Sequence, residues 1–180
     1  MKRITSKDLV IFVLALLAMG QAVVLGVRWR SRAGGSAASW LKAGDDLSGI
    51  HPVDGSGRMA SFAGGALRVV LVFDSQCGHC RSVAPAWRDW IASLPADVSV
   101  VGVSTEAPES ARAFVEEHGW GVEVWRVEGS RGSPEHALIS RTPWVFVVDG
   151  EGRILAEGQG TRLAEVADAF VGAAGKAAGP

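Results

Sequence analysis

The sequence has few cysteines. Only two occur among its 180 residues, Cys77 and Cys80, and they stand three positions apart. If this pair is chemically reactive, no cysteine is left for a structural disulfide. A structural zinc site normally needs about four Cys or His ligands in paired spacing, and the other histidines are scattered, at His51, His118 and His136. The sequence therefore predicts no metal site.

An excess of basic residues is also lacking outside the first segment of the chain. Six of the 18 lysine and arginine residues lie in residues 1–32, together with one of the 19 acidic residues. The rest of the chain holds 12 basic and 18 acidic residues, a formal charge of −6. Nucleic-acid binding normally requires a basic face. The charge distribution therefore argues against a nucleic-acid partner.

Residues 9–27 form an uncharged, predominantly apolar run. As a helix this run would be about 28 Å long, close to the roughly 30 Å hydrocarbon core of a bilayer. Basic residues flank both of its ends, as is common for membrane spans. We therefore expect a single transmembrane anchor in contact with the lipid bilayer. A signal peptide cleaved near residues 36–38 is the alternative.

Apolar patterning predicts alternating strands and helices in the middle of the chain. The run at 67–73 is apolar apart from Arg68 and indicates a strand that is buried on both faces of a sheet. Asp54-Gly55 predicts the turn of an N-terminal hairpin at 53–59. Further strands are expected at 98–103, 122–127, 144–148 and 153–156, and helices at 78–94, 108–117, 134–139 and 163–171. This order indicates an α/β fold with a sheet between layers of helices.

The Cys-Gly-His-Cys motif at 77–80 joins the strand at 67–73 to the helix at 78–94. The first turn of a helix has unpaired N–H groups and the positive end of the helix dipole, which favour a thiolate. A lone Cys-x-x-Cys in this context is typical of thiol–disulfide exchange. We therefore expect Cys77 to be the nucleophile and Cys80 the resolving thiol. Chemistry that makes or breaks disulfides outside the cytosol would give the anchor a purpose.

Several motifs together resemble the thioredoxin fold and, more narrowly, the membrane-anchored TlpA/ResA-like thiol–disulfide oxidoreductases. The matched features are the strand that leads into Cys77 and Cys80, Pro85 in the following helix, Thr142-Pro143 before an apolar strand, and the Asp-Gly-Glu-Gly-Arg turn at 149–153. The resemblance covers residues 45–173. It implies a three-layer sandwich with a central mixed sheet, preceded by an N-terminal hairpin extension and one transmembrane helix.

The resemblance also implies roles for residues around the cysteines. Pro143 is expected to be cis, and Thr142, Pro143 and Trp144 are expected to bind the substrate. Gly78 and His79 are expected to tune the cysteine pair. Cys-Gly-His-Cys is similar to the active site of protein disulfide isomerase, so we expect His79 to stabilise the thiolate and raise the reduction potential.

The sequence departs from the resembled family at positions close to the cysteines. The family usually has an aromatic residue directly before the first cysteine, where this chain has Gln76. Leu71 stands where thioredoxin has a buried Asp, and Val83 stands where ResA-like proteins often have a Glu. Asp74 is the nearest carboxylate in the sequence. It either faces the sulfur or serves as a local cap in a solvated loop.

We divide the chain into an anchor at 1–32, a linker at 33–44, a thioredoxin-like domain at 45–173 and a flexible tail at 174–180. The basic residues on the two sides of the anchor balance, so charge does not fix its orientation. We place the N-terminus in the cytoplasm and the domain on the extracytoplasmic side, periplasmic or cell-surface.

The expected function is disulfide exchange with partner proteins through Cys77 and Cys80, without a cofactor. The expected partners are protein dithiols or disulfides and a membrane or extracytoplasmic redox partner, and some members of the resembled family act in cytochrome c maturation. Two alternatives stay open. Residues 103–106 and the helix after them resemble a peroxiredoxin, which suggests a peroxidase. The other alternative is not an enzyme: a membrane-tethered binding or chaperone module in which the cysteines form a redox-gated contact.

Overall fold

The computed structural model describes residues 21, 40–65, 67–168 and 170. The expected transmembrane segment at 9–27, apart from Gln21, lies outside these residues, as does the expected tail at 174–180. Both stay predictions. Across the described part of the chain, no helix is both long and apolar enough to cross a bilayer.

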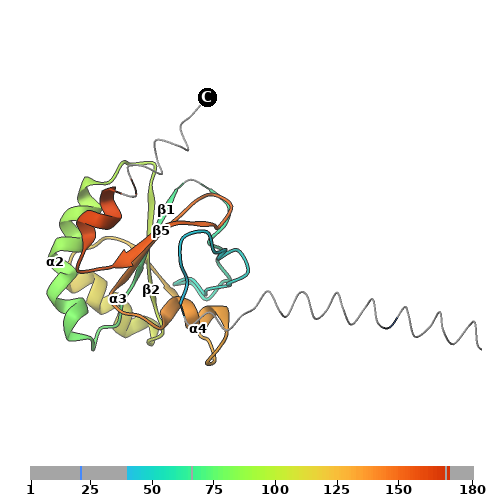
Figure 1. Ribbon diagram of the computed structural model, residues 1–180. Coiled ribbons are helices and arrows are strands. Elements are labelled where there is room, and N and C mark those ends of the chain that lie inside the picture. The colour runs from blue at the N-terminus through green and yellow to red at the C-terminus, as the bar shows by residue number, and fades with distance from the viewer. Residues whose placement is uncertain (1–20, 22–39, 66, 169, 171–180) are drawn as a thin grey trace, which may run out of the picture. The chain divides into compact units, whose positions relative to one another are not determined.

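A five-stranded mixed sheet forms the centre of the domain (Figure 1). The strands, in their order across the sheet, are β3 (Glu123–Arg126), β2 (Ser99–Ser104), β1 (Arg68–Val72), β4 (Trp144–Val148) and β5 (Ile154–Gln159). The three strands β3, β2 and β1 are parallel, whereas β4 is antiparallel to both β1 and β5. The predicted central mixed sheet is therefore confirmed.

β1 is the central strand, and its last four residues are buried. Its final residue, Val72, pairs with Val103 near the end of β2 and with Trp144 at the start of β4. The loop that leaves β1 therefore lies beside the loop that enters β4. This edge of the sheet is where the residues predicted to be functional come together.

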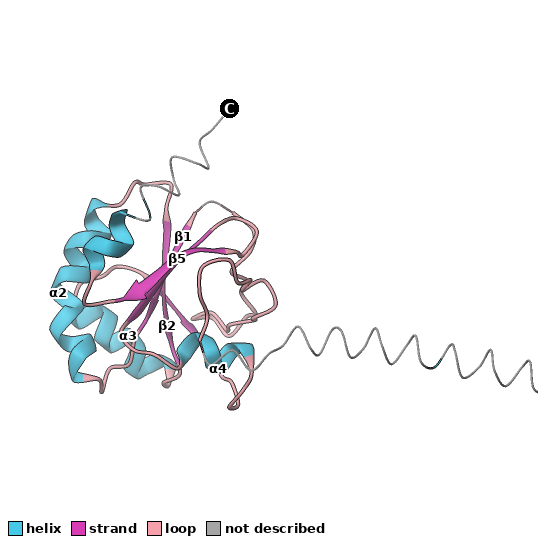
Figure 2. Ribbon diagram, viewed as in Figure 1, coloured by secondary structure: helices cyan, strands magenta, loops and turns pink. Residues whose placement is uncertain are grey.

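Helices cover both faces of the sheet (Figure 2). On one face lie α2 (Gly78–Ser93), α3 (Pro108–Glu117) and a helical segment at 163–168. On the other face lie α4 (Pro134–Ile139) and the largely irregular segment 41–62. This arrangement has the three layers that the sequence predicts.

The alternation of side chains along β1 divides the core into two clusters. Leu71 points into the first cluster, where it packs with Trp87 of α2 and Phe114 of α3. Val70 points into the second cluster, with side chains of α4 and of the segment before β1. Leu41, which lies within the expected linker, is also buried in this second cluster.

The predicted helices and strands agree with the structure to within a few residues. α3 has the predicted bounds, and soon after its end the chain turns at Gly119, whose φ is +65°. Glycine adopts this left-handed conformation without the strain of a Cβ atom. α2 runs through Pro85 without a break.

The N-terminal hairpin predicted at 53–59 is reduced to a single bridge between Val53 and Met59. Asp54 closes the turn by accepting hydrogen bonds from backbone N–H groups within it. The backbone of Val53 also pairs with that of Arg126 on the outer strand β3. The turn therefore covers the edge of the sheet instead of extending as a separate two-stranded ribbon.

Replacing Leu71 by Ala should lower the free energy of unfolding by about 2–5 kcal/mol, because it leaves a cavity between β1 and α2. Leu71 is fully buried, whereas Met59 is 73% exposed. Met59→Ala is the control and should change the free energy of unfolding by less than about 0.5 kcal/mol. Urea unfolding measures both changes. Equal effects of the two substitutions would contradict the packing described here.

Candidate functional site

Cys77 ends the loop after β1 and immediately precedes α2. Its backbone is extended, with φ −76° and ψ 114°, and its side chain is partly exposed. Cys80 lies within the first turn of α2 and is fully buried. Both are free thiols in this structure. The strand–loop–helix setting that the sequence predicts for the pair is therefore present.

The surroundings of Cys77 favour its thiolate. Burial has the largest single effect and raises the pKa of Cys77. Hydrogen bonds to its sulfur outweigh this effect and bring the pKa below the ordinary value. They come from the backbone N–H and thiol of Cys80, the side chain of Thr142 and the backbone N–H of His79. Backbone N–H groups in the first turn of a helix have no partner within the helix, so they are available to sulfur.

The second sulfur has the opposite environment. Burial raises the pKa of the Cys80 thiol to about 12, and the neighbouring Cys77 contributes to the rise. Near neutral pH, Cys80 is therefore protonated while Cys77 is the more acidic of the two. Since the thiolate is the nucleophilic form, Cys77 is the partly exposed attacking sulfur and Cys80 is the buried thiol that can resolve a mixed disulfide.

The peptide bond between Thr142 and Pro143 is cis, as predicted. It lies directly before β4, and the Sγ atom of Cys77 is 4.0 Å from the backbone oxygen of Thr142. Pro143 is buried and Thr142 is partly exposed. The structure thus brings this loop against a cysteine that is 65 positions away in the sequence.

A support for this loop was missed in the sequence. The indole Nε1 of Trp87 donates to the backbone oxygen of Gly160 at 2.9 Å, and the N–H of Gly160 donates to the oxygen of Pro143 at 3.0 Å. A Cβ atom at Gly160 would overlap the ring of Trp87. The sequence signal was Trp87 itself, within the predicted helix at 78–94, because a buried indole N–H needs an acceptor. The position of that acceptor depends on the tertiary fold.

The two residues between the cysteines are both exposed. The backbone N–H of His79 is one of the groups that lower the pKa of Cys77. Gly78 begins α2, and a Cβ atom there would meet no neighbour within 4 Å. The predicted tuning by the imidazole of His79 stays a prediction.

Trp144 packs against the second core cluster, on the face of the sheet opposite to α2. The guanidinium of Arg141 lies over its ring at 4.6 Å from the centroid, and over the ring of Trp40 at 3.7 Å. Trp40 is 48% exposed. Trp144, Arg141 and Trp40 therefore form an aromatic and cationic surface. Trp144 packs against the second core cluster, whereas Cys80 lies in the first. The role of Trp144 in substrate binding stays a prediction.

Asp74 serves as a local cap. Its Oδ1 atom accepts a hydrogen bond from the backbone N–H of Gln76 at 2.7 Å. Of the two readings that the sequence left open, the structure therefore favours the cap. Leu71 and Val83 both lie in the first core cluster, which also contains Cys80. Because both side chains are apolar, neither position supplies a carboxylate to the sulfur atoms.

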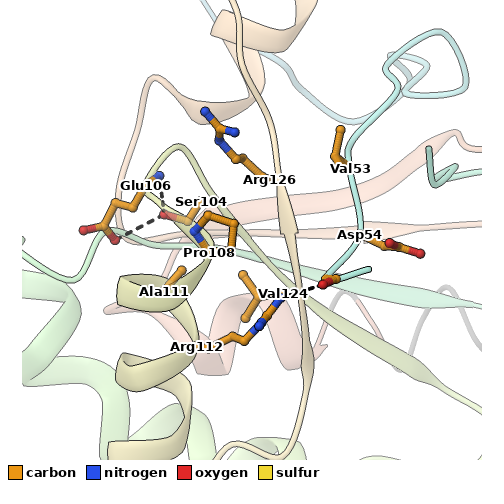
Figure 3. A pocket seen from close by; sticks show the side chains of 10 residues that line it. Val53, Asp54, Ser104, Glu106, Pro108, Ala111, Arg112, Val124 and Arg126 are labelled. Carbon is orange, nitrogen blue, oxygen red and sulfur yellow. Dashed lines mark hydrogen bonds between the residues drawn. The ribbon is translucent and has the colours of Figure 1, made fainter. Parts of the chain in front are cut away.

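No group of three or more His, Cys, Asp and Glu side chains within the described ranges could hold a metal ion. A small hollow has neither cysteine in its lining, which includes Ser104 and Glu106 (Figure 3). It is bounded by the turn at 53–55, by β3 and by the beginning of α3. Arg112 spans it by donating to the backbone oxygen of Gly55 at 2.6 Å. The hollow belongs to the contact between the N-terminal turn and the sheet edge.

Comparison with known proteins identifies the fold. No protein-family model and no curated protein matches the sequence. Among solved structures, a candidate thiol:disulfide interchange protein DsbE from Chlorobium tepidum is 21% identical, with a TM-score of 0.57 over 74% of this chain and 98% of that one. The thioredoxin domain of a thiol-disulfide oxidoreductase from Bacteroides vulgatus is 24% identical, with a TM-score of 0.55 over 73% and 99%. The chain has a thioredoxin fold.

The same fold is shared by a protein that is named for a different chemistry. The peroxidoxin BcpB from Mycobacterium tuberculosis is 17% identical, with a TM-score of 0.54 over 73% of this chain and 95% of that one. The expected resemblance to thiol–disulfide oxidoreductases is thus confirmed at the level of the thioredoxin fold. The choice of chemistry rests on the residues of the site.

The two thiols should react with iodoacetamide over different pH ranges. The rate at Cys77 should rise with a midpoint below that of an ordinary cysteine thiol, because its thiolate is stabilised. Cys80, whose pKa is raised to about 12, should stay unmodified in the folded protein at pH 8. Mass spectrometry of digested samples measures both sites. Preferential modification of Cys80 would contradict the assignment.

Proposed function

We propose that the protein is a thiol–disulfide oxidoreductase that exchanges disulfides with protein substrates through Cys77 and Cys80. The observation that supports this most directly is the contrast between the two sulfurs. Cys77 is partly exposed with a lowered pKa, and Cys80 is buried with a pKa raised to about 12. The cis Pro143 loop lies directly beside the exposed sulfur.

In the reductive direction, the thiolate of Cys77 attacks one sulfur of a partner disulfide. A new S–S bond forms between Cys77 and the partner, the partner disulfide breaks, and its other sulfur leaves as a thiolate that takes up a proton. Cys80 then loses its proton and attacks the Sγ atom of Cys77. The mixed disulfide breaks, and the second partner sulfur leaves. The partner gains two electrons and two protons, and the protein is left with a Cys77–Cys80 disulfide.

The buried position of Cys80 suits the second step. A protonated thiol at this site does not compete for the incoming partner, and it faces Cys77 from within the same helical turn. Attack becomes intramolecular once the mixed disulfide has formed, which favours it over a second partner thiol. The same two steps in reverse donate a disulfide to a partner dithiol.

The Thr142–Pro143 loop is the proposed contact for the substrate backbone. Thr142 is partly exposed and its backbone oxygen is close to Cys77. An extended segment on either side of a substrate cysteine can pair with such a backbone edge and so align the sulfur. Trp144 and the adjacent Arg141 would contact side chains of the same partner.

The proposal includes a membrane anchor at 9–27, with the thioredoxin-fold domain on the extracytoplasmic side. Its support is the uncharged run of sufficient length with basic residues at both ends. The partner would then be a protein dithiol or disulfide, or a membrane redox protein, outside the cytosol. Membrane fractionation combined with protease access to the domain in spheroplasts tests this part separately from the chemistry. Recovery of the full chain in the cytosolic fraction would contradict the anchor.

A peroxidase with the same fold is the second candidate, because BcpB is a structural neighbour and residues 103–106 resemble a peroxiredoxin. Peroxiredoxins place a Pro and a Thr or Ser at set positions before the reactive cysteine. This chain has Asp74 three positions before Cys77 and Val70 seven before it. The residues of the site therefore favour disulfide exchange.

Insulin reduction driven by dithiothreitol tests the proposed exchange. Cys77→Ser should lower the rate to the uncatalysed level, because it removes the attacking sulfur. With insulin disulfide and without dithiothreitol, Cys80→Ser should accumulate a mixed disulfide through Cys77 that is visible on a non-reducing gel. Ser82→Ala, an exposed change on the same helix, is the matched control and should leave the rate within about twofold.

Two results would contradict disulfide exchange. Loss of trapping in Cys80→Ser, with partner binding that survives removal of both cysteines, would indicate a binding module. Rapid consumption of hydrogen peroxide by Cys80→Ser, without insulin reduction by the unmodified protein, would indicate a peroxidase.

Replacing His79 should lower the reduction potential of the pair. His79→Gln removes the imidazole but keeps the backbone N–H that contacts Cys77, so it isolates the effect of the side chain. We expect a shift of tens of mV toward more negative values, within the span of about −180 to −270 mV that separates protein disulfide isomerase from thioredoxin. His79→Pro, which also removes the N–H group, should shift the potential further. Equilibration with glutathione measures it, and an unchanged potential in His79→Gln would reject the tuning role.

A further inference from the structure

Hydrogen bonds of Ser75 hold the loop that ends at Cys77 in place. This residue is 5% exposed and is one of two polar residues in the buried part of the described core. Buried polar groups must be hydrogen-bonded, because an unpaired one costs about 1–3 kcal/mol. Each polar group of Ser75 finds a partner in the structure.

Two of these groups bind one carboxylate. Glu106 Oε2 accepts from the backbone N–H of Ser75 at 2.7 Å, and Glu106 Oε1 accepts from the Ser75 hydroxyl at 2.5 Å. Glu106 lies in the loop between β2 and α3, 31 positions away in the sequence. Such charge-assisted bonds are short and stronger than bonds between neutral groups. The carboxylate therefore ties the loop after β1 to the loop after β2.

Glu106 is itself held in place by Ser104 at the end of β2 (Figure 3). The hydroxyl of Ser104 donates to Glu106 Oε2 at 3.2 Å and accepts from the backbone N–H of Glu106 at 3.2 Å. Ser104 is 1% exposed. The carboxylate is thus oriented from the rigid sheet and does not depend on a mobile surface side chain.

The third polar group of Ser75 is hydrogen-bonded to α2, the helix that contains Cys80. Its backbone oxygen accepts from Nε of Arg81 at 3.0 Å. Arg81 lies in α2, and its own backbone N–H donates to the oxygen of Cys77 at 3.2 Å. Ser75 is therefore hydrogen-bonded to Glu106 on the side of the sheet and to Arg81 on the side of α2.

We propose that Glu106 is a positioning residue for Cys77, acting through its two hydrogen bonds to Ser75. The inference rests on the proposed disulfide exchange and adds a residue to it. It gives Glu106, the last residue of the segment at 103–106 that resembles a peroxiredoxin, a role that does not involve peroxide. It also explains how the loop stays ordered with Gln76 at the position where the resembled family has an aromatic side chain.

The function of this contact follows from the position of Ser75, two residues before the nucleophile. The thiolate of Cys77 depends on N–H groups at His79 and Cys80 that point at its sulfur. Hydrogen bonds of this kind are sensitive to distance and angle. If the loop is released, Cys77 moves relative to the helix terminus, and those bonds lengthen. Its pKa should then rise.

Glu106→Ala tests the proposal in the full-length protein. We expect the pH midpoint for alkylation of Cys77 to rise by about 0.5–1 unit, and the exchange rate at pH 6.5 to fall by about 3–10-fold, in proportion to the thiolate fraction. Glu106→Gln keeps an oxygen that can accept from the N–H of Ser75, so it should lose less than about threefold. Glu109→Ala removes an exposed acidic residue three positions away and is the matched control, with no change in midpoint.

The pairing with Ser75 is tested by a double-mutant cycle. Ser75→Ala removes the hydroxyl bond to Glu106 but keeps the backbone N–H bond, so it should raise the midpoint in the same direction by a smaller amount. Ser75→Ala combined with Glu106→Ala should give less than the sum of the two shifts, because the hydroxyl bond is lost in both single variants. If urea unfolding shows that Glu106→Ala does not fold, Ser75→Ala measured in the same way decides the question. An unchanged midpoint in Ser75→Ala would then overturn the proposal.

Other outcomes separate this inference from the proposed function. Insulin reduction by the unmodified protein, with Glu106→Ala equal to Glu109→Ala in both midpoint and rate, would overturn the positioning role and leave disulfide exchange intact. Absence of exchange by the unmodified protein at every pH would reject the proposed function itself. A loss of stability in Glu106→Ala with an unchanged pH midpoint would indicate a merely structural residue.

Discussion

The chemistry proposed for this protein depends on a difference in solvation between two sulfur atoms that lie in one helical turn. Burial keeps Cys80 protonated, with a pKa raised to about 12, whereas hydrogen bonds lower the pKa of the more exposed Cys77. If both thiols were exposed, neither would be set apart as the attacking group. If both were buried, neither would reach a partner. The beginning of a helix beside a packed core provides both environments at once.

The fold maintains this difference through contacts from three directions. β1 directs the chain into the loop before Cys77, and the antiparallel pairing of β1 with β4 brings the cis Pro143 loop against the sulfur. Trp87 and Gly160 support the Thr142–Pro143 loop through hydrogen bonds, and Glu106 supports the loop that ends at Cys77. Trp87 belongs to α2, and Glu106 is bonded to Ser104 at the end of β2. The reactive loops are therefore fixed by the sheet and α2.

Sequence patterns predicted the regular elements well because those elements follow local periodicity. The predominantly apolar run at 67–73 and the predicted helix at 78–94 need no tertiary information, and the cis bond at Pro143 followed from a resemblance. The hairpin at 53–59 was overestimated, because its turn pairs with Arg126 across the sheet edge. The contact between Ser75 and Glu106 was missed because its partners are 31 positions apart. Such contacts exist only once the strands are in register.

The central claim is that Cys77 and Cys80 form a reversible disulfide with each other. The most direct test equilibrates the purified protein with glutathione buffers, alkylates the remaining thiols and measures the intramolecular disulfide by mass spectrometry. The account predicts a single two-electron transition between about −120 and −270 mV, the range of known exchange proteins. A pair that stays reduced throughout this range, or that oxidises only between molecules, would contradict it.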